Sequence, residues 1–279
     1  MTTPFLALTR DVAPSMVECE LTHLARTPID VARARIQHAG YERLLAALGC
    51  TVLRVDSAPS YPDSVFIEDT AVVFDEIAIL TRPGAASRRG ELPAVEAALA
   101  ELRPIARISD PATLEGGDVF VVGRRVFVGR TARTNAEGIA QLGALLAPYG
   151  YVVEGVTVTG CLHLKSAATA LDEATVLCNP AWVDPAAFAP LRTIAVHPDE
   201  PMGANILRVG TGLLYDEAYP RTRSRLEDHG YAMQLVDASE LAKAEGAVTC
   251  CSLILRTLAV VRVPPYTVFR SPLMPSRTA

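Results

Sequence analysis

Near the middle of the chain stands Asp118-Val119-Phe120-Val121-Val122-Gly123-Arg124-Arg125-Val126-Phe127-Val128, two apolar runs joined by a polar Gly-Arg-Arg turn. Short apolar runs on either side of a glycine-containing turn predict a β-hairpin. Residues 135–146 then predict a helix, and the extended run 151–153 predicts a further strand. The segment is therefore predicted to form a ββαβ-type unit.

This order of elements recurs along the chain. Residues 72–80 and 206–215 show the same pair of apolar runs, followed by helices predicted over 91–102 and up to His229. Residues 168–177 repeat the hairpin. Units of this kind bury their apolar faces only against neighbours, so their repetition predicts a radial α/β assembly. Strand ends and loops would converge on a central funnel that could hold a small ligand.

The N-terminal part is predicted to contain a helix between two strands. The strands are predicted over 5–9 and 51–55, and the helix over 30–48, with Asp30 as its N-cap. The apolar side chains predicted to face the core are Val31, Ile36, Leu44 and Leu45. Residues 14–27 lack a steady period and predict a long loop.

Composition excludes several functional classes. The 279 residues carry a formal net charge of -5 and no basic run, which argues against nucleic-acid binding. No apolar run is long enough to span a membrane, and the N-terminal sequence lacks a signal-peptide pattern. The six cysteines form no C-x-x-C pair and fit neither a zinc site nor a disulfide framework. We therefore expect a cytoplasmic protein with reduced thiols.

Two thiols occur near the end of the chain, in Gly246-Ala247-Val248-Thr249-Cys250-Cys251-Ser252, before the apolar run 253–255 that predicts a strand. A thiol at the point where a loop enters a strand is held rigidly and can still face a cleft, which suits a nucleophile. Free cysteine is also a common small core residue, so this pattern alone leaves both interpretations open.

Two adjacent acids, Glu68 and Asp69, stand inside the apolar run 65–74, which predicts a strand. Neighbouring strand residues point to opposite faces, so at least one acid of a covered strand would point inward or into a cleft. The alternative is a strand end at which both acids are solvated.

Two further motifs carry polar groups. Leu114-Glu115-Gly116-Gly117-Asp118 places two glycines between acids, where they permit a tight turn or a close approach of backbones. Cys161-Leu162-His163-Leu164-Lys165-Ser166 places a histidine in a short apolar run, in which strand alternation would point Cys161, His163 and Lys165 to one face. A lone histidine in such a run is usually structural, and only its combination with the other motifs favours a catalytic role.

In their order along the chain, these motifs resemble those of the dimethylarginine dimethylaminohydrolases, a family of the guanidine-modifying (pentein) superfamily. The matching segments are Pro62-Asp63-Ser64-Val65-Phe66-Ile67-Glu68-Asp69, Arg82-Pro83-Gly84-Ala85-Ala86-Ser87-Arg88-Arg89, Glu115-Gly116-Gly117-Asp118, Ala132-Arg133-Thr134-Asn135, His163-Leu164-Lys165-Ser166 and Thr249-Cys250-Cys251-Ser252. The resemblance implies an α/β fold, a five-unit α/β propeller of ββαβ-type units around a central funnel. We expect one catalytic domain over 1–262 and a proline-rich extension over 263–279.

The resemblance also implies residue roles by position. The catalytic group consists of Cys250 as nucleophile, His163 as general acid and base, and Glu115 as the carboxylate that orients the histidine. The substrate-binding group consists of Glu68 and Asp69 at the guanidinium end and Asp63, Arg88 and Arg133 at the amino-acid end. Leu21 matches the residue whose backbone meets the substrate amine, with Leu24 as the alternative.

The activity that the resemblance implies is hydrolysis of an N-omega-methylated arginine to citrulline and dimethylamine or methylamine, through a covalent thiouronium intermediate on Cys250. Paired carboxylates can hold the guanidinium N–H groups in a fork, and the bound cation would favour the thiolate. His163 would protonate the leaving amine and then activate water. This chemistry requires no metal ion and no organic cofactor, and the expected partner is a small-molecule substrate; a homodimer is left open.

Lys165 bears on the choice of substrate. Arginine deiminases of the superfamily usually carry an aspartate two residues after the histidine, where it holds the other edge of the guanidinium. The chain has Lys165 at this position, which should favour an N-alkylated edge. Other N-substituted arginines remain compatible with the pattern.

Two alternatives stay open. One is another enzyme of the superfamily, an arginine or agmatine deiminase or an amidinotransferase; Arg88 and Arg133 argue against agmatine, because they require a carboxylate partner. The other is a non-catalytic protein that binds free amino acids. The presence of Cys250 and His163 argues against it, because binding alone needs no nucleophile.

Overall fold

The structure, a computed structural model, describes residues 5–257. Their strands form five three-stranded sheets, and in every sheet an antiparallel pair is joined by a third strand that runs parallel to its neighbour. Four sheets are built from consecutive strands: β3 (Ala71–Val73), β4 (Ala78–Leu80) and β5 (Ile105–Arg107); β6 (Val119–Val122), β7 (Arg125–Arg130) and β8 (Val152–Thr157); β9 (Ala168–Ala170), β10 (Thr175–Cys178) and β11 (Arg192–Ala195); β12 (Ile206–Val209), β13 (Gly212–Asp216) and β14 (Gln234–Val236). The predicted α/β architecture of repeated ββαβ-type units is confirmed.

The fifth sheet joins the two ends of the described chain. β15 (Leu253–Arg256) pairs antiparallel with β1 (Phe5–Thr9), which pairs parallel with β2 (Cys50–Arg54). Leu6 lies opposite Leu255 in this register, and both side chains are buried. The strand that follows the cysteine pair is therefore the edge strand of this sheet and pairs with β1, which comes from the opposite end of the described chain.

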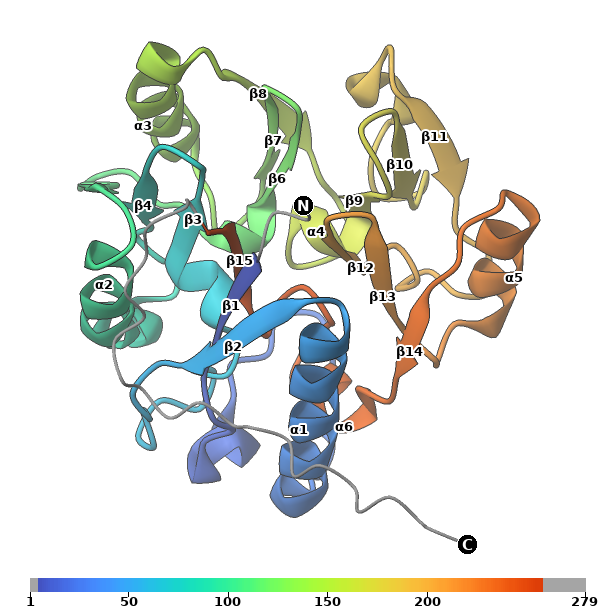
Figure 1. Ribbon diagram of the computed structural model, residues 1–279, viewed down its shortest axis with the longest axis horizontal. Helices are drawn as coiled ribbons and strands as arrows, with labels where there is room; N and C mark the ends of the chain where they lie inside the picture. Colours follow the sequence, from blue (N-terminus) through green and yellow to red (C-terminus); the bar gives the residue numbers. More distant parts are fainter. Residues whose placement is uncertain (1–4, 258–279) are drawn as a thin grey trace, which may run out of the picture.

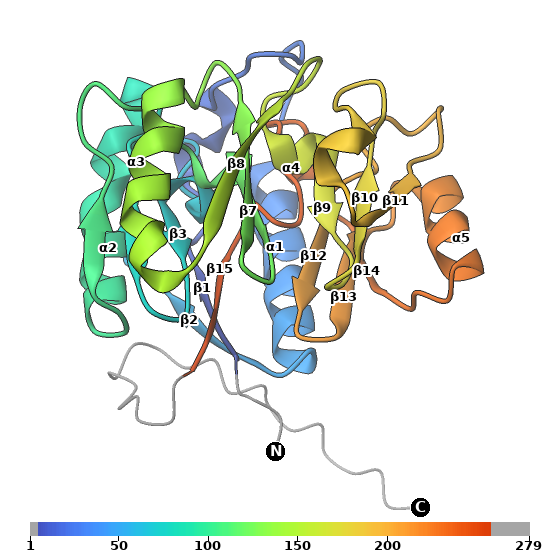
Figure 2. The same ribbon diagram turned by 90° about the horizontal axis from the view of Figure 1, so that it is seen from above.

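Helices lie on the outside of the ring of sheets, as Figures 1 and 2 show. They connect the second and third strands of four sheets: α1 (Val31–Ala47), α2 (Leu92–Ala100), α3 (Ala136–Leu146) and α5 (Pro220–Asp228). In the sheet of β9–β11 this connection carries instead the 3-10 helix η6 (Pro185–Phe188). Two one-turn helices, α4 (Leu164–Ala167) and α6 (Ser239–Ala242), lie elsewhere along the chain. Among residues 5–257, no helix is long and apolar enough to cross a membrane.

Helix α1 corrects one detail of the sequence-based prediction. Asp30 caps it as expected, since its side chain accepts a hydrogen bond from the backbone N–H of Arg33. Ile36, predicted to face the core, is 70% exposed, whereas the buried positions include Tyr41 and Leu45. With 3.6 residues per turn, Ile36 lies on the side of the helix opposite Ala34, which is fully buried. The predicted loop over 14–27 also contains a short 3-10 helix, η1 (Pro14–Glu18).

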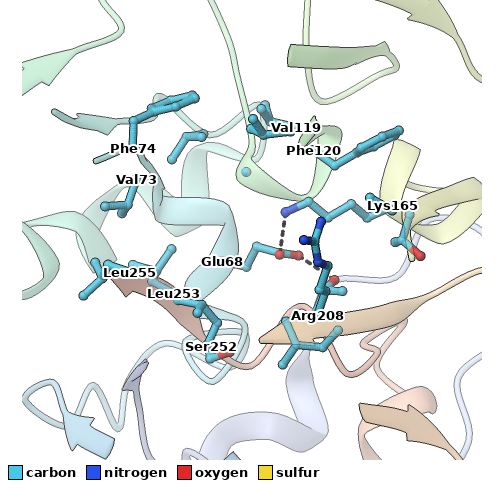
Figure 3. Close-up of a pocket in the computed structure, with 18 of the residues that line it drawn as sticks. Glu68, Val73, Phe74, Val119, Phe120, Lys165, Arg208, Ser252, Leu253 and Leu255 are labelled. Carbon is cyan, nitrogen blue, oxygen red and sulfur yellow. Dashed lines mark hydrogen bonds and ion pairs between the residues drawn. The ribbon is translucent and has the colours of Figure 1, made fainter. Parts of the chain in front are cut away.

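The centre of the ring is lined by β3, β6, β9, β12 and β15, one strand from each sheet. These strands enclose a cavity of about 600 Å³. Figure 3 shows Phe74, Phe120, Leu253 and Leu255 around it, with Glu68 and Lys165 facing each other within it. The predicted central funnel is thus present.

The predicted domain boundary at 262 and the extension 263–279 lie outside the described residues.

Candidate active site

The candidate catalytic residues stand just before the inner strands. Cys250 precedes β15, His163 precedes α4 and β9, and Glu115 precedes the 3-10 helix η4 (Gly116–Asp118) and β6. Glu68 and Asp69 lie in the 3-10 helix η2 (Ile67–Thr70), immediately before β3. Because the inner strands surround one axis, the segments that enter them meet at one end of the ring. Cys250, His163 and Asp69 line a common cavity there, together with Asp63, Arg88 and Arg133.

The acids at positions 68 and 69 are not in a strand, and that prediction was wrong. In η2 both side chains are buried, Glu68 at 6% and Asp69 at 3% exposure, so the alternative with both acids in solvent is also wrong. The 3-10 turn directs them to different partners. The carboxylate of Asp69 accepts hydrogen bonds from Arg88 and from the backbone N–H of Gly117, whereas that of Glu68 accepts them from Lys165 and Thr249.

Cys250 lies in a turn rather than in a strand. It is partly exposed and lines the site cavity, whereas Cys251 is fully buried in the core, so the turn separates the two thiols. The backbone N–H of Glu68 donates to the carbonyl of Cys250 at 3.1 Å, which holds the thiol next to the acids. Burial, aided by the negative charges of Glu68 and Asp69, raises the pKa of Cys250 to about 12. Without a bound cation, the thiol is therefore protonated at neutral pH.

His163 and Glu115 form a buried ion pair. His163 Nε2 lies 2.7 Å from Glu115 Oε2, within hydrogen-bond distance. Burial alone would lower the pKa of His163, but Asp69, Asp118 and Glu115 raise it to about 9. Burial alone would raise the pKa of Glu115, but the hydrogen bond and charge of His163, with Arg133, lower it to about 2. At neutral pH the pair is an imidazolium and a carboxylate.

The two glycines of the Glu-Gly-Gly-Asp motif permit this close packing. A Cβ atom on Gly116 would lie 1.9 Å from the carbonyl oxygen of Glu68, and one on Gly117 would lie 2.7 Å from His163 Nδ1. The predicted close approach of backbones is confirmed. Asp118, at the end of the motif, accepts a hydrogen bond from the backbone N–H of Leu164 at 2.9 Å and so fixes the residue that follows the histidine.

The strand alternation predicted for residues 161–165 is wrong. His163 is the N-cap residue of α4, so Lys165 lies in a helical turn. Its ammonium reaches Glu68 at 2.6 Å, while His163 reaches Glu115 and Cys161 packs in the core. Lys165 lines the larger cavity (Figure 3), whereas Cys250 lines the small one beside His163.

Arg88 is fully engaged with protein groups. Its Nη1 lies 2.5 Å from Asp69 Oδ2, its Nε and Nη2 bind the carboxylate of Glu91, and Nη2 also donates to two backbone carbonyls. Burial would lower its pKa, but Glu91 and Asp69 raise it well above the usual value. Arg133 contacts Glu115 at 3.3 Å and the hydroxyl of Thr22 at 3.2 Å. The two arginines thus already pair with carboxylates of the site.

Asp63 and the early loop, defined as residues 20–28, lie beside these arginines. Asp63 accepts a hydrogen bond from the backbone N–H of Glu20 at 3.1 Å, and burial raises its pKa to about 6. Leu21 is partly buried and packs against the core, whereas Leu24 is 38% exposed. Of the two candidates for the amine contact, Leu21 is the one that packs inward, although Glu20 is the early-loop residue found in the lining of the site cavity.

The site cavity itself is small, about 20 Å³, which is room for roughly one water molecule. An arginine-sized ligand therefore requires groups around it to move. Asp69, Glu115 and His163 place ligand atoms within 4.8 Å of one another, a set that could hold a metal ion, but Arg88 and Arg133 already neutralise the two carboxylates.

Several residues of the site escaped the sequence analysis. Ala244, Glu245 and Gly246 line the cavity beside Cys250. The glycine that opens the cysteine segment was the available signal for them. Asn205 brackets Thr249, donating to its hydroxyl at 2.9 Å and accepting from its backbone N–H at 3.1 Å. No pattern around Asn205 could have indicated this, because the contact joins segments 44 residues apart.

Comparison with curated proteins reveals close relatives. The N(G),N(G)-dimethylarginine dimethylaminohydrolase of Streptomyces coelicolor is 43% identical over 253 residues, which cover 90% of this chain and 97% of the relative. The chain belongs to the dimethylarginine dimethylaminohydrolase family. The Pseudomonas aeruginosa member is 35% identical over 88% of this chain and 97% of its own length. A search against family models gave no match.

Solved structures agree with this membership. A cysteine-to-serine variant of the dimethylarginine dimethylaminohydrolase of P. aeruginosa, complexed with citrulline, superposes with a TM-score of 0.84 at 33% identity, covering 90% of this chain and all of the other. A histidine-to-glycine variant of a dimethylarginine dimethylaminohydrolase, present as an adduct with S-methyl-L-thiocitrulline, gives a TM-score of 0.85 at 34% identity over 89% of this chain and 98% of the other. The N-terminal domain of a cyanobacterial arginine dihydrolase shares the fold, with a TM-score of 0.79 at 19% identity over 91% of this chain and 98% of the other. The family membership and the five-unit fold expected from the sequence are confirmed.

Proposed function

We propose that the protein hydrolyses asymmetric dimethylarginine or monomethylarginine to citrulline and the corresponding methylamine. The single observation that carries the proposal is the placement of Cys250, His163 and Asp69 around one cavity, with the His163–Glu115 ion pair beside them. A thiol supplies the nucleophile, an imidazolium supplies a proton for the leaving amine, and a buried carboxylate can hold a guanidinium. The family's enzymes are named for this reaction.

The first half of the reaction begins when the substrate guanidinium binds beside Asp69. Its positive charge counteracts the burial and the negative charges of Glu68 and Asp69 that keep the pKa of Cys250 high, so the thiol releases its proton to solvent. The Cys250 thiolate attacks the central guanidinium carbon and forms a C–S bond. His163 donates its proton to the methylated nitrogen, the C–N bond breaks, and the amine leaves. The product on the protein is a thiouronium.

The second half uses the same two residues. His163, now neutral, takes a proton from a water molecule as its oxygen attacks the thiouronium carbon. The C–S bond breaks and Cys250 leaves as a thiolate, and the proton that remains on the new oxygen passes to solvent as citrulline forms. His163 ends protonated, as at the start, and the net reaction consumes one water molecule.

At the amino-acid end, we assign Asp63 and the backbone at Leu21 to the substrate amine, and Arg88 and Arg133 to its carboxylate. Asp63 is buried and faces the early loop through Glu20. Arg133 makes long contacts of 3.3 and 3.4 Å to Glu115, so it can turn towards a carboxylate at little cost. Arg88 would have to exchange its ion pair with Asp69, at 2.5 Å, for one with the substrate carboxylate.

Two broader features belong to the same proposal. We assign the reaction to one catalytic domain over residues 1–262. We place the protein in the cytoplasm, because all six cysteines are free thiols. We assign no metal ion and no organic cofactor to the reaction, because the thiol, the imidazolium and the carboxylates supply every step. Size measurement by light scattering would decide whether the domain works as a monomer or a homodimer.

The test is citrulline release from asymmetric dimethylarginine, with arginine in parallel. The variants are Cys250→Ser and, as matched control, Cys251→Ser in the neighbouring core position. Turnover of the methylated substrate, lost at least about 1,000-fold only in Cys250→Ser, would support the proposal. Preferential turnover of arginine would make the protein a deiminase, and binding of both amino acids without turnover would make it a binding protein.

A further inference from the structure

We propose that Glu245 is a positioning residue that fastens the early loop over the active site. The proposal rests on the function proposed above, because it concerns access of the substrate to Cys250. It deepens that function by assigning the control of entry to a residue five positions before the cysteine.

The carboxylate of Glu245 binds three successive backbone N–H groups of the early loop. Its Oε1 accepts from Thr22 at 3.0 Å, from His23 at 2.5 Å and from Leu24 at 2.6 Å, and its Oε2 accepts from Thr22 at 3.1 Å. Successive N–H groups that converge on one anion form a nest, and hydrogen bonds to a charged acceptor are the strong ones. More than 200 residues of chain separate the two partners, so this contact joins distant parts of the fold.

The early loop has little else to hold its tip. Residues 22–28 are exposed, and the guanidinium of Arg26 binds only nearby groups, at Val17 and Cys19. Its other ties to the body of the protein are at Glu20, which contacts Asp63 and Ser87, at the Thr22 hydroxyl, and at the far end of the loop, where the carbonyl of Pro28 accepts from Lys243 at 3.0 Å. A segment with few buried contacts opens at low free-energy cost, so the nest has a large influence on its position.

Glu245 ends the turn that follows α6. Its backbone N–H donates to the carbonyl of Ala242 at 3.1 Å, and that of Gly246 donates to Leu241 at 3.1 Å, a common hydrogen-bond pattern at the end of a helix. Its φ angle is 59°, and within residues 5–257 it is the only residue other than glycine in the left-handed region, where a non-glycine residue pays a cost. Here it turns the side chain to the early loop while Ala244, Glu245 and Gly246 line the cavity that contains Cys250.

The contact joins the loop to the catalytic residues. Thr22, held by Glu245, contacts Arg133, which contacts Glu115, which binds His163. With the loop in this place, the cavity of about 20 Å³ cannot admit an amino acid. Substrate entry therefore requires the nest to release the loop, and reclosure around the amino-acid end restores it.

The variants that test this are Glu245→Gln, which keeps the shape but removes the charge, and Glu245→Gly, which removes the carboxylate and relieves the backbone. Glu18→Gln is the matched control, since Glu18 is an exposed acid in η1 next to the loop. Amide hydrogen exchange at residues 22–24 and alkylation of Cys250 by iodoacetamide report the loop directly, without turnover. Both rates should rise about tenfold in the Glu245 variants and stay unchanged in the control, because a hydrogen bond to a charged group typically contributes that much.

Turnover of dimethylarginine provides the second readout. We expect KM to rise about tenfold while kcat and the melting temperature stay near the wild-type values, because the chemistry lies in other residues. Unchanged exchange and alkylation would overturn the proposal, and so would a fall in kcat that accompanies a lower melting temperature. If the wild type hydrolyses no methylated arginine, the proposed function fails, whereas the exchange and alkylation rates still decide the role of Glu245.

Discussion

The ammonium of Lys165 lies 2.6 Å from the carboxylate of Glu68, and this ion pair divides the centre of the ring. Glu68, Lys165 and Thr249 line the large cavity, whereas residues beside them in the chain, including Asp69 and Cys250, line the candidate active site. Lys165 stands at the position where arginine deiminases usually carry an aspartate, and its charge also pairs with the buried carboxylate of Glu68. Burial raises the pKa of Glu68, and the charge of Lys165 opposes that rise.

Replacing Lys165 by methionine should lower the free energy of unfolding by about 3 kcal/mol, because it leaves a buried carboxylate without its cation. The double variant Lys165→Met/Glu68→Gln should recover most of the loss, since no charge is then left unpaired. Urea denaturation measures both. Equal destabilisation by the single and double variants would show that the lysine acts through packing.

Arginine turnover in Lys165→Met checks whether the lysine also sets the preference for a methylated edge.

The thiol of Cys250 should react slowly with iodoacetamide in the free enzyme at neutral pH. Its pKa of about 12 leaves roughly one thiolate in ten thousand at pH 8, so the alkylation rate should still be rising at pH 10. A bound guanidinium ligand would shield the thiol from iodoacetamide, so the measurement uses the free enzyme. Mass spectrometry locates the label, with Cys250→Ser as control. A plateau below pH 8 would contradict the prediction.

The alkaline limb of the kcat/KM profile, which reports groups of the free enzyme, should fall near pH 9, where His163 loses the proton that it gives to the leaving amine. Glu115→Gln removes one of the charges that raise this pKa, so the limb should move to lower pH. The same shift affects stability: the pKa is raised above 6.5 in the fold, so the contribution is complete below that pH and is lost as pH rises through 9. An alkaline limb that stays in place in Glu115→Gln would exclude the ion pair as its origin.

The repeat pattern predicts a radial α/β assembly, because each hairpin at 119–130 or 206–216 is local in sequence and its two apolar runs flank a turn. The number of five units came from the resemblance to a known family. The geometry of the candidate active site was harder to predict from the sequence than the fold. The sequence predicts a strand for Glu68 and Asp69 where the structure has a 3-10 turn, because a buried 3-10 helix of this length has no period of its own. The identities of the site residues came from motif order, which carries no geometry.

The contacts that link the motifs could not be predicted from the sequence. Glu245 binding the early loop and Asn205 binding Thr249 are both tertiary contacts between segments with no shared pattern. The pairing of Arg88 with Asp69 is of the same kind, because both were assigned to a substrate and not to each other.

Arg88 can serve the substrate carboxylate, the buried acids, or both, and one variant separates these roles. Arg88→Ala leaves Asp69 and Glu91 buried without their cation, so the free energy of unfolding should fall by about 3 to 5 kcal/mol. Arg89→Ala, which loses only a hydrogen bond to the Pro83 carbonyl, is the matched control and should cost about 1 kcal/mol. If Arg88→Ala instead keeps wild-type stability and raises KM alone, Arg88 is a substrate ligand that pairs with Asp69 only while the site is closed.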